Sequence, residues 1–302
     1  MPVRVVDVAG VPVTLEACDD ERAEGLAAAF TAFRPTDEPS RAAITVDANA
    51  GVVPSRPPHS QFREFSFWEE PDGLVLSAPG IVVVVEGKRA RAHVPDPAAF
   101  AYLEACVYLP VTWFLARHGR FVLHGGAVAR DGRALLLLGG SGAGKSTLVA
   151  AALEAGWEAL ADDVVIVHAD GAGGFRVHGV HRRPTIPMEL GGPVVESAEP
   201  LADPRERAAL PRDVLATGDR ALAGVVLIAH ADDDGFLRTA PGFRVLPLLL
   251  QSFGATVDPR LRAAFFPVAG DLSRLPRWEL ALAVDPTVRR AHAAVHLGHC
   301  AP

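Results

Sequence analysis

The sequence predicts an α/β fold in which helices flank a sheet, preceded by a smaller β-rich region. From residue 121 onward, apolar strand patterns alternate with helical patterns, as in layered α/β proteins. Residues 1–95 instead contain short runs rich in Val, Phe and Ile that Gly or Pro separates, which is typical of strands. We therefore expect two parts, a β-rich N-terminal region at 1–95 and an α/β domain at 96–302.

The N-terminal region is expected to contain one helix, at 19–30, among its strands. The stretch at 47–60 is rich in Pro, Gly and Ser and predicts a loop. No motif in this region carries chemistry, so a structural platform and a surface that receives a substrate both remain open. A helix is expected next at 96–119, with Asp96 as its cap, and then two strands joined by a turn at 121–140.

The composition limits the classes of partner and compartment. With 302 residues, of which 49% are hydrophobic and 22% charged, the chain is long enough to bury a large core. Its net charge of −7 argues against a general nucleic-acid binder. The apolar stretch at 105–116 is broken by Pro110 and too short to span a bilayer, and the N-terminus lacks a secretory signal. Three widely spaced cysteines fit a reducing compartment, so we expect a soluble cytoplasmic protein.

The sequence GGSGAGKST at 139–147 fits the phosphate-loop template. A strand pattern at 134–138 precedes it and a helix pattern at 147–156 follows it, as such a loop requires. Glycines let successive N–H groups turn inward around phosphate oxygens, and the helix N-terminus adds partial positive charge. The residues expected to bind the phosphates of a nucleotide are Gly139, Gly140, Ser141, Gly142, Ala143, Gly144, Lys145, Ser146 and Thr147.

Two residues of this loop have specific expected roles. In the template, Lys145 reaches the β- and γ-phosphates and the Ser146 hydroxyl ligates Mg²⁺. Lys88 and Lys145 are the only lysines among 29 Lys and Arg residues, so an Arg-biased chain keeps Lys where a compact ammonium is needed. ATP and Mg²⁺ are therefore the expected cofactors.

Two adjacent acids, Asp162 and Asp163, lie within a predicted strand at 157–171. Because side chains alternate across a strand, the two should point to opposite faces, and at most one can enter the nucleotide site. A carboxylate in this place can ligate Mg²⁺ or accept the proton of an acceptor hydroxyl. His124 ends a strand close in sequence to the loop, although a lone His beside an apolar strand is more often structural.

The rest of the chain offers weaker signals. His181, Arg182 and Arg183 could clamp phosphate or an acidic substrate, or form a solvated bend, and the sequence favours neither. The charge-dense stretch at 194–220 predicts a surface flap. A buried strand is expected at 223–235, in which the acids at 232–234 are interpreted as a solvated turn. Two helices, a strand and a last helix are then predicted at 243–255, 258–276, 277–283 and 286–298.

Three motifs in a fixed order carry a resemblance to a known family: HGGAV from His124, GGSGAGKST, and ALADDVV around Asp162 and Asp163. At these spacings the chain resembles the HPr kinase/phosphorylase family and its related kinases, clearly over 121–170 and in outline to residue 298. The resemblance implies a phosphate-loop nucleotide-binding core with a fold like that of phosphoenolpyruvate carboxykinases. It also implies that Asp162 is the catalytic carboxylate and that Asp163 and His124 form a supporting pair. Lys145 is the further catalytic candidate, because its ammonium would neutralise charge on the transferring group.

One part of that family's pattern is missing. The later Glu-x-Arg-Gly stretch, which supplies a further metal ligand, is absent, and Glu189 stands in roughly that place. The metal ligands implied are therefore Ser146, Asp162 and Glu189. The chain looks like a divergent member, similar to HPr-kinase-like enzymes that modify peptides in natural-product pathways.

Together these signals predict an ATP- and Mg²⁺-dependent, HPr-kinase-like serine kinase that transfers the γ-phosphoryl group to a hydroxyl, of Ser or Thr in a peptide or protein. The alternatives are a small-molecule kinase and a regulatory protein that binds a nucleotide and transfers nothing. The expected partner is a peptide, a protein or a small hydroxyl acceptor, without nucleic acid or membrane, and self-association into a homo-oligomer remains open.

Overall fold

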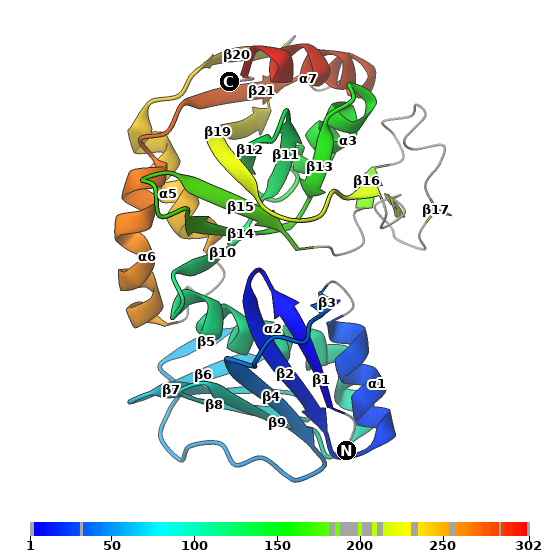
Figure 1. The fold of residues 1–302 in the computed structure, drawn as a ribbon, viewed down its shortest axis with the longest axis vertical. Coiled ribbons are helices and arrows are strands. Elements are labelled where there is room, and N and C mark those ends of the chain that lie inside the picture. Colours follow the sequence, from blue (N-terminus) through cyan, green and yellow to red (C-terminus); the bar gives the residue numbers. More distant parts are fainter. Residues whose placement is uncertain are drawn as a thin grey trace. The chain divides into compact units, whose positions relative to one another are not determined.

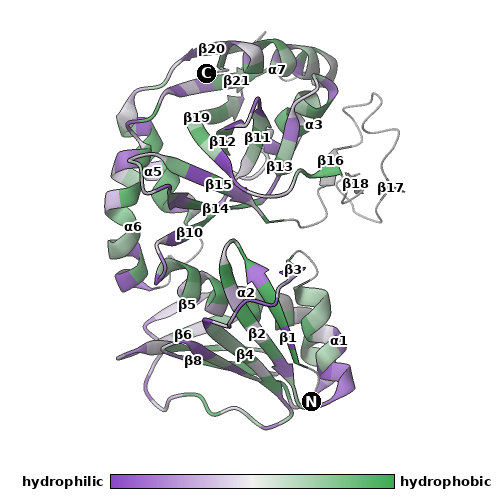
Figure 2. Cartoon of the chain, viewed as in Figure 1, coloured by the Kyte–Doolittle hydropathy of each residue, from purple (hydrophilic) through white to green (hydrophobic). Residues whose placement is uncertain are grey.

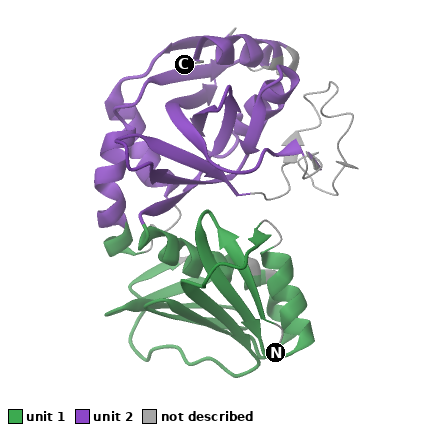
Figure 3. Cartoon of the chain, in the orientation of Figure 1, with its two compact units in different colours: residues 1–118, 255–261 green, residues 119–254, 262–302 purple. Residues whose placement is uncertain are grey.

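The computed structural model shows a mixed α/β protein with two large sheets (Figure 1). It describes residues 3–30, 33–180, 185–187, 199–200, 207–209, 214–230, 235–253, 258–283 and 285–300. The chain forms two compact units (Figure 3). Unit 1 contains Met1–His118 and Ala255–Leu261, and unit 2 contains Gly119–Gly254 and Arg262–Pro302.

Unit 1 is built on one sheet, as the Val- and Phe-rich runs predict. Within the described residues it has nine strands in the order β3-β1-β2-β4-β9-β8-β7-β6-β5. Strand β4 shows the strict alternation of buried and half-buried residues that a sheet covered on one face requires. The strands are β1 (Val3–Val8), β2 (Val11–Ala17), β3 (Arg34–Pro35), β4 (Ala42–Asp47), β5 (Ser60–Phe62), β6 (Phe65–Glu70), β7 (Gly73–Ala78), β8 (Ile81–Glu86) and β9 (Arg89–His93).

Two helices belong to unit 1, α1 (Asp20–Ala29) and α2 (Phe100–Ala116), the second preceded by a 3₁₀ turn at Pro97–Ala99. The Asp19 side chain caps α1 by accepting a hydrogen bond from the Arg22 amide. Helix α2 is predominantly apolar and packs on α1 and on several strands of this sheet. The division between the units therefore falls after His118, whereas the sequence places it after residue 95.

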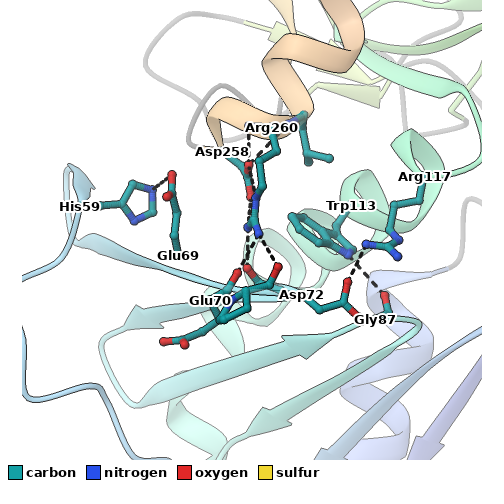
Figure 4. A network of polar contacts seen from close by, with 12 residues as sticks. His59, Glu69, Glu70, Asp72, Gly87, Trp113, Arg117, Asp258 and Arg260 are labelled. Atoms are coloured by element: carbon teal, nitrogen blue, oxygen red, sulfur yellow. Dashed lines mark hydrogen bonds and ion pairs between the residues drawn. The ribbon is translucent and has the colours of Figure 1, made fainter.

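A short segment from late in the chain completes unit 1, and Arg260 anchors it (Figure 4). Its guanidinium donates to the backbone carbonyls of Glu70 at 2.7 Å and Gly73 at 2.7 Å. It also pairs with the Asp258 carboxylate at 2.8 Å and lies 5.0 Å from the centre of the Trp113 ring. Because Asp258 is 1% exposed, this pairing satisfies a charge that burial would otherwise destabilise.

Unit 2 contains the second large sheet, with strand order β10-β14-β15-β19-β12-β11-β13, in which β21 adds to β19 and β20 adds to β21. Strands β12, β19 and β21 run parallel to one another, and the other pairings are antiparallel. The strands are β10 (Arg120–His124), β11 (Gly126–Arg130), β12 (Arg133–Leu138), β13 (Glu158–Ala161), β14 (Val164–Ala169), β15 (Phe175–Gly179), β19 (Arg220–His230), β20 (Phe236–Thr239) and β21 (Arg277–Leu282). A small separate sheet contains β16 (Thr185–Pro187), β17 (Glu199–Pro200) and β18 (Arg207–Ala209).

The described helices of unit 2 cover its apolar strands (Figure 2). Helices α3 (Lys145–Glu154) and α7 (Pro286–Cys300) share one core with β12, β19 and β21. Helices α5 (Gly242–Ser252) and α6 (Pro259–Leu272) follow β20, and the first residues of α6 group with unit 1. These elements lie close to the predicted helices at 243–255, 258–276 and 286–298, which are confirmed. Among the described helices, none is both long and apolar enough to cross a bilayer.

Candidate functional site

The topology of unit 2 brings four chain segments to one edge of its sheet. Strand β12 ends at this edge, and because β11 is antiparallel to β12, β11 begins there, with Gly126 paired to Leu137. Strand β13 ends there too, since Ala161 pairs with Ala127 near the start of β11. Strand β19 is parallel to β12 and also ends there. The loop after β12, the acids after β13, His124 before β11 and the end of β19 therefore converge.

The Gly-rich segment at 139–144 connects β12 directly to α3, as the sequence predicts. Two glycines adopt left-handed backbone conformations, with φ of +78° at Gly142 and +105° at Gly144. At Gly144 a side chain is also excluded by space, because a Cβ atom would lie 2.5 Å from the Leu282 side chain. The Ala143 amide donates to the Gly140 carbonyl at 3.2 Å, which closes a tight turn.

Lys145, the first residue of α3, directs its ammonium back into this loop. It is 7% exposed and donates to the carbonyls of Gly139 at 2.9 Å and Gly140 at 3.1 Å. Burial lowers the pKa of the Lys145 ammonium, and the negative charges of Asp163 and Asp162 oppose that shift. Both aspartates are therefore close enough to act on the charge held in the loop.

Asp162 and Asp163 form a two-residue bend between β13 and β14. The prediction of one continuous strand at 157–171 is therefore wrong, because the chain turns from pairing with β11 to pairing with β10 at this point. The expected placement of the two acids on opposite faces does not apply, since alternation holds only within a strand. Asp162 is 8% exposed, whereas 42% of the Asp163 side chain is exposed.

His124 lies against Asp163, as the resemblance implies. The His124 Nδ1 is 3.0 Å from the Asp163 Oδ1, and 51% of the His124 side chain is exposed. The Gly125 amide also donates to the Asp163 backbone carbonyl at 2.9 Å. Side-chain and backbone contacts thus fix the bend beside the start of β11.

A second histidine, His230, reaches the Gly-rich loop and was not predicted. Its Nε2 donates to the Gly142 carbonyl at 2.8 Å. His230 is the last residue of β19, the parallel neighbour of β12. The strand order is what places it there, and no local motif around residue 230 carries that information.

Some predicted site residues fall outside the described part of the chain. These are Glu189 and the basic residues His181, Arg182 and Arg183; the acids at 232–234, interpreted as a solvated turn, also lie outside the described residues. Of the predicted metal ligands, Ser146 and Asp162 are described. In the described part of the chain, no three or more His, Cys, Asp or Glu residues are grouped so as to hold a metal ion. The metal and nucleotide sites therefore stay predictions.

A separate histidine–carboxylate cluster lies at the far end of β14 and was also not predicted. Asp219 accepts from His168 Nε2 at 3.0 Å and from His178 Nδ1 at 2.8 Å. Burial would raise the pKa of the Asp219 carboxyl, but the hydrogen bonds from His168 and His178 outweigh it and hold that pKa well below its ordinary value. The cluster joins β14, β15 and the start of β19.

Comparison with known proteins gives a family match over part of the chain. Residues 100–189 match the family described as SynChlorMet cassette protein ScmC. No curated protein matches the sequence. Among solved structures, the HPr(Ser) kinase/phosphatase from Coxiella burnetii aligns at 11% sequence identity and a TM-score of 0.30, over 59% of this chain and 95% of that one. The chain is thus similar over residues 100–189 to the SynChlorMet cassette protein ScmC family, and that range contains both the Gly-rich loop and the bend at Asp162.

Proposed function

We propose that this protein is an ATP- and Mg²⁺-dependent phosphotransferase that transfers the γ-phosphoryl group to a hydroxyl, of Ser or Thr in a peptide or protein. The observation that carries the proposal is the position of Lys145. Its ammonium is buried in a Gly-rich loop at the N-terminus of α3, and two adjacent carboxylates act on its charge. Phosphoryl transfer needs a cation for the transferring group and a carboxylate beside it.

The loop has the properties that a triphosphate site requires. It stands at the N-terminus of α3, where the backbone amides of the first turn and the helix dipole favour an anion. Gly142 and Gly144 give the backbone conformations that other residues rarely adopt. The two carbonyl acceptors of Lys145 are neutral, so a phosphate oxygen would be a stronger partner for the same ammonium.

The proposed transfer assigns one role to each polar group. Ser146 and Asp162 would hold Mg²⁺, which would neutralise charge on the phosphates. A carboxylate has two oxygens, so Asp162 can also accept the proton of the acceptor hydroxyl. The hydroxyl oxygen then bonds to the γ-phosphorus, the bond from that phosphorus to the bridging oxygen breaks, and ADP leaves. His124 would hold Asp163 in place through their 3.0 Å contact.

The first test removes the cation and uses the only other lysine as a matched control. With γ-labelled ATP and candidate peptides, Lys145→Ala should reduce phosphoryl transfer at least 100-fold, because the charge on the γ-phosphate loses its partner. Lys88→Ala, in the turn between β8 and β9, should keep wild-type transfer. Thermal unfolding confirms that each variant is folded, and Lys145→Met keeps the aliphatic stem if the alanine variant is not. Undiminished transfer by folded Lys145→Ala and Lys145→Met would refute the assignment.

Asp162's burial supports one rival, a regulatory protein that binds a nucleotide and transfers nothing. A carboxylate that is 8% exposed has little surface to offer an acceptor. Under this alternative, the wild-type chain binds ATP but shows no single-turnover loss of the γ-phosphoryl group with any acceptor. A small-molecule kinase is distinguished in the same assay, because label then appears in a metabolite and not in a peptide.

A further inference from the structure

His230 connects the Gly-rich loop to the neighbouring strand. The Nε2–H of His230 donates to the Gly142 carbonyl at 2.8 Å, since a carbonyl oxygen can only accept. The two residues are 88 positions apart in the chain. The parallel pairing of Leu138 with Leu227 brings the end of β19 beside the start of the loop.

The carbonyl groups of the loop are held by several donors. Lys145 holds the carbonyls of Gly139 and Gly140, and the Leu148 amide holds that of Gly144 within α3. These donors belong to the loop or to the helix that follows it. The Gly142 carbonyl instead accepts a hydrogen bond from His230, which lies on the neighbouring strand β19.

Gly142 is the position where such support matters. Its φ is +78°, a conformation that only glycine adopts readily, and nothing lies within 4 Å of the place where a Cβ atom would stand. Packing at that position therefore does not hold the backbone in this conformation. The His230 hydrogen bond fixes the orientation of the peptide between Gly142 and Ala143.

We propose that His230 is a positioning residue that holds the Gly-rich loop in the conformation that receives the nucleotide phosphates. This inference rests on the proposed function. His230 need not touch the reacting atoms, because its effect passes through the Gly142 carbonyl. Losing one hydrogen bond of this kind changes an equilibrium constant, here that of ATP binding, by roughly three- to tenfold.

The first experiment measures the Kd for ATP with Mg²⁺ in three variants. His230→Ala should raise the Kd about fivefold, whereas kcat at saturating ATP should stay within about twofold of wild type. His230→Gln keeps an N–H donor on a side chain of similar reach and should restore the Kd to within about twofold. His299→Ala, at an exposed position of α7, is the control and should bind ATP like wild type.

The second experiment needs no nucleotide. Backbone amide hydrogen exchange over residues 140–146 should be faster in His230→Ala than in wild type, and unchanged in His299→Ala. If wild type binds no ATP, the proposed function fails, and the exchange measurement alone decides whether His230 orders the loop. An unchanged Kd in His230→Ala overturns the inference, as does a fall in kcat without a change in Kd.

Discussion

Two histidine–carboxylate clusters lie at the two ends of β14, and they differ in almost every property except composition. At the start of the strand, Asp163 contacts His124, and about half of each side chain is exposed. Near its end, Asp219 contacts both His168 and His178, and these side chains are mostly buried. The first cluster adjoins the charge of Lys145, whereas the second adjoins Arg176, 3.7 Å away.

The difference shows how a carboxylate that holds strands together can be told from one that is open to chemistry. Each oxygen of Asp219 accepts a hydrogen bond from a different histidine, on β14 and on β15, so both oxygens are engaged and the carboxylate joins two strands. Its low pKa follows from those contacts. Asp163 instead has a partly exposed side chain beside the buried ammonium of Lys145. Such arrangements are common at sites that bind or transfer charged groups.

The largest expected effect separates the two aspartates at the loop. Asp162→Asn should reduce phosphoryl transfer by at least 100-fold while the Kd for ATP at saturating Mg²⁺ changes by less than about threefold, because the amide keeps an oxygen that can ligate Mg²⁺ but cannot accept the hydroxyl proton. Asp163→Asn should have a smaller effect, since Asp163 is assigned to support. Transfer and ATP binding measured on both variants decide the assignment, and the reverse order of effects would make the more exposed Asp163 the base.

Asp219→Asn at the other end of β14 is the matched substitution and should act on stability instead. The new amide nitrogen would face a histidine donor, so we expect a loss of about 2 kcal/mol in the free energy of unfolding, with unchanged transfer by the folded fraction. Urea unfolding at pH 7 measures this loss. If Asp219→Asn is as stable as wild type, the hydrogen bonds of this cluster do not stabilise the fold.

The pH dependence of that loss has a defined sign. The pKa of Asp219 is lower in the folded chain than its ordinary value of 3.8, so its ionisation stabilises the fold fully above that value. This stabilisation disappears as the pH falls toward the folded-state pKa. His168, His178 and Arg176 face the site in wild type and in Asp219→Asn alike. The difference in free energy of unfolding between the two proteins should therefore narrow between pH 5 and pH 3.

Local patterns predicted much of this arrangement, and contacts distant in sequence decided the rest. The loop at 139–144 was predictable because strand, glycines and helix follow one another directly. The bend at Asp162 was not, because Val164–Val167 continue the apolar run and hide a change of partner strand. The contact of His230 with Gly142 depends on strand order, to which no single segment points. Helix α2 groups with unit 1, whereas the sequence places it with the α/β domain, because its apolar surface does not say which sheet it covers.

The smallest expected effects come from the same histidine substitution made in each of the two clusters. His124→Ala should reduce transfer about tenfold, the equivalent of one hydrogen bond to a charged group, because Asp163 loses the partner that orients it. Its free energy of unfolding should change by less than about 0.5 kcal/mol, since the side chain is half exposed. His178→Ala should instead lower the free energy of unfolding by about 1 kcal/mol and leave transfer unchanged, because its contact is with Asp219. Transfer assays and urea unfolding on both variants give four values, and equal effects of the two substitutions on transfer would mean that the two ends of β14 do not differ in function.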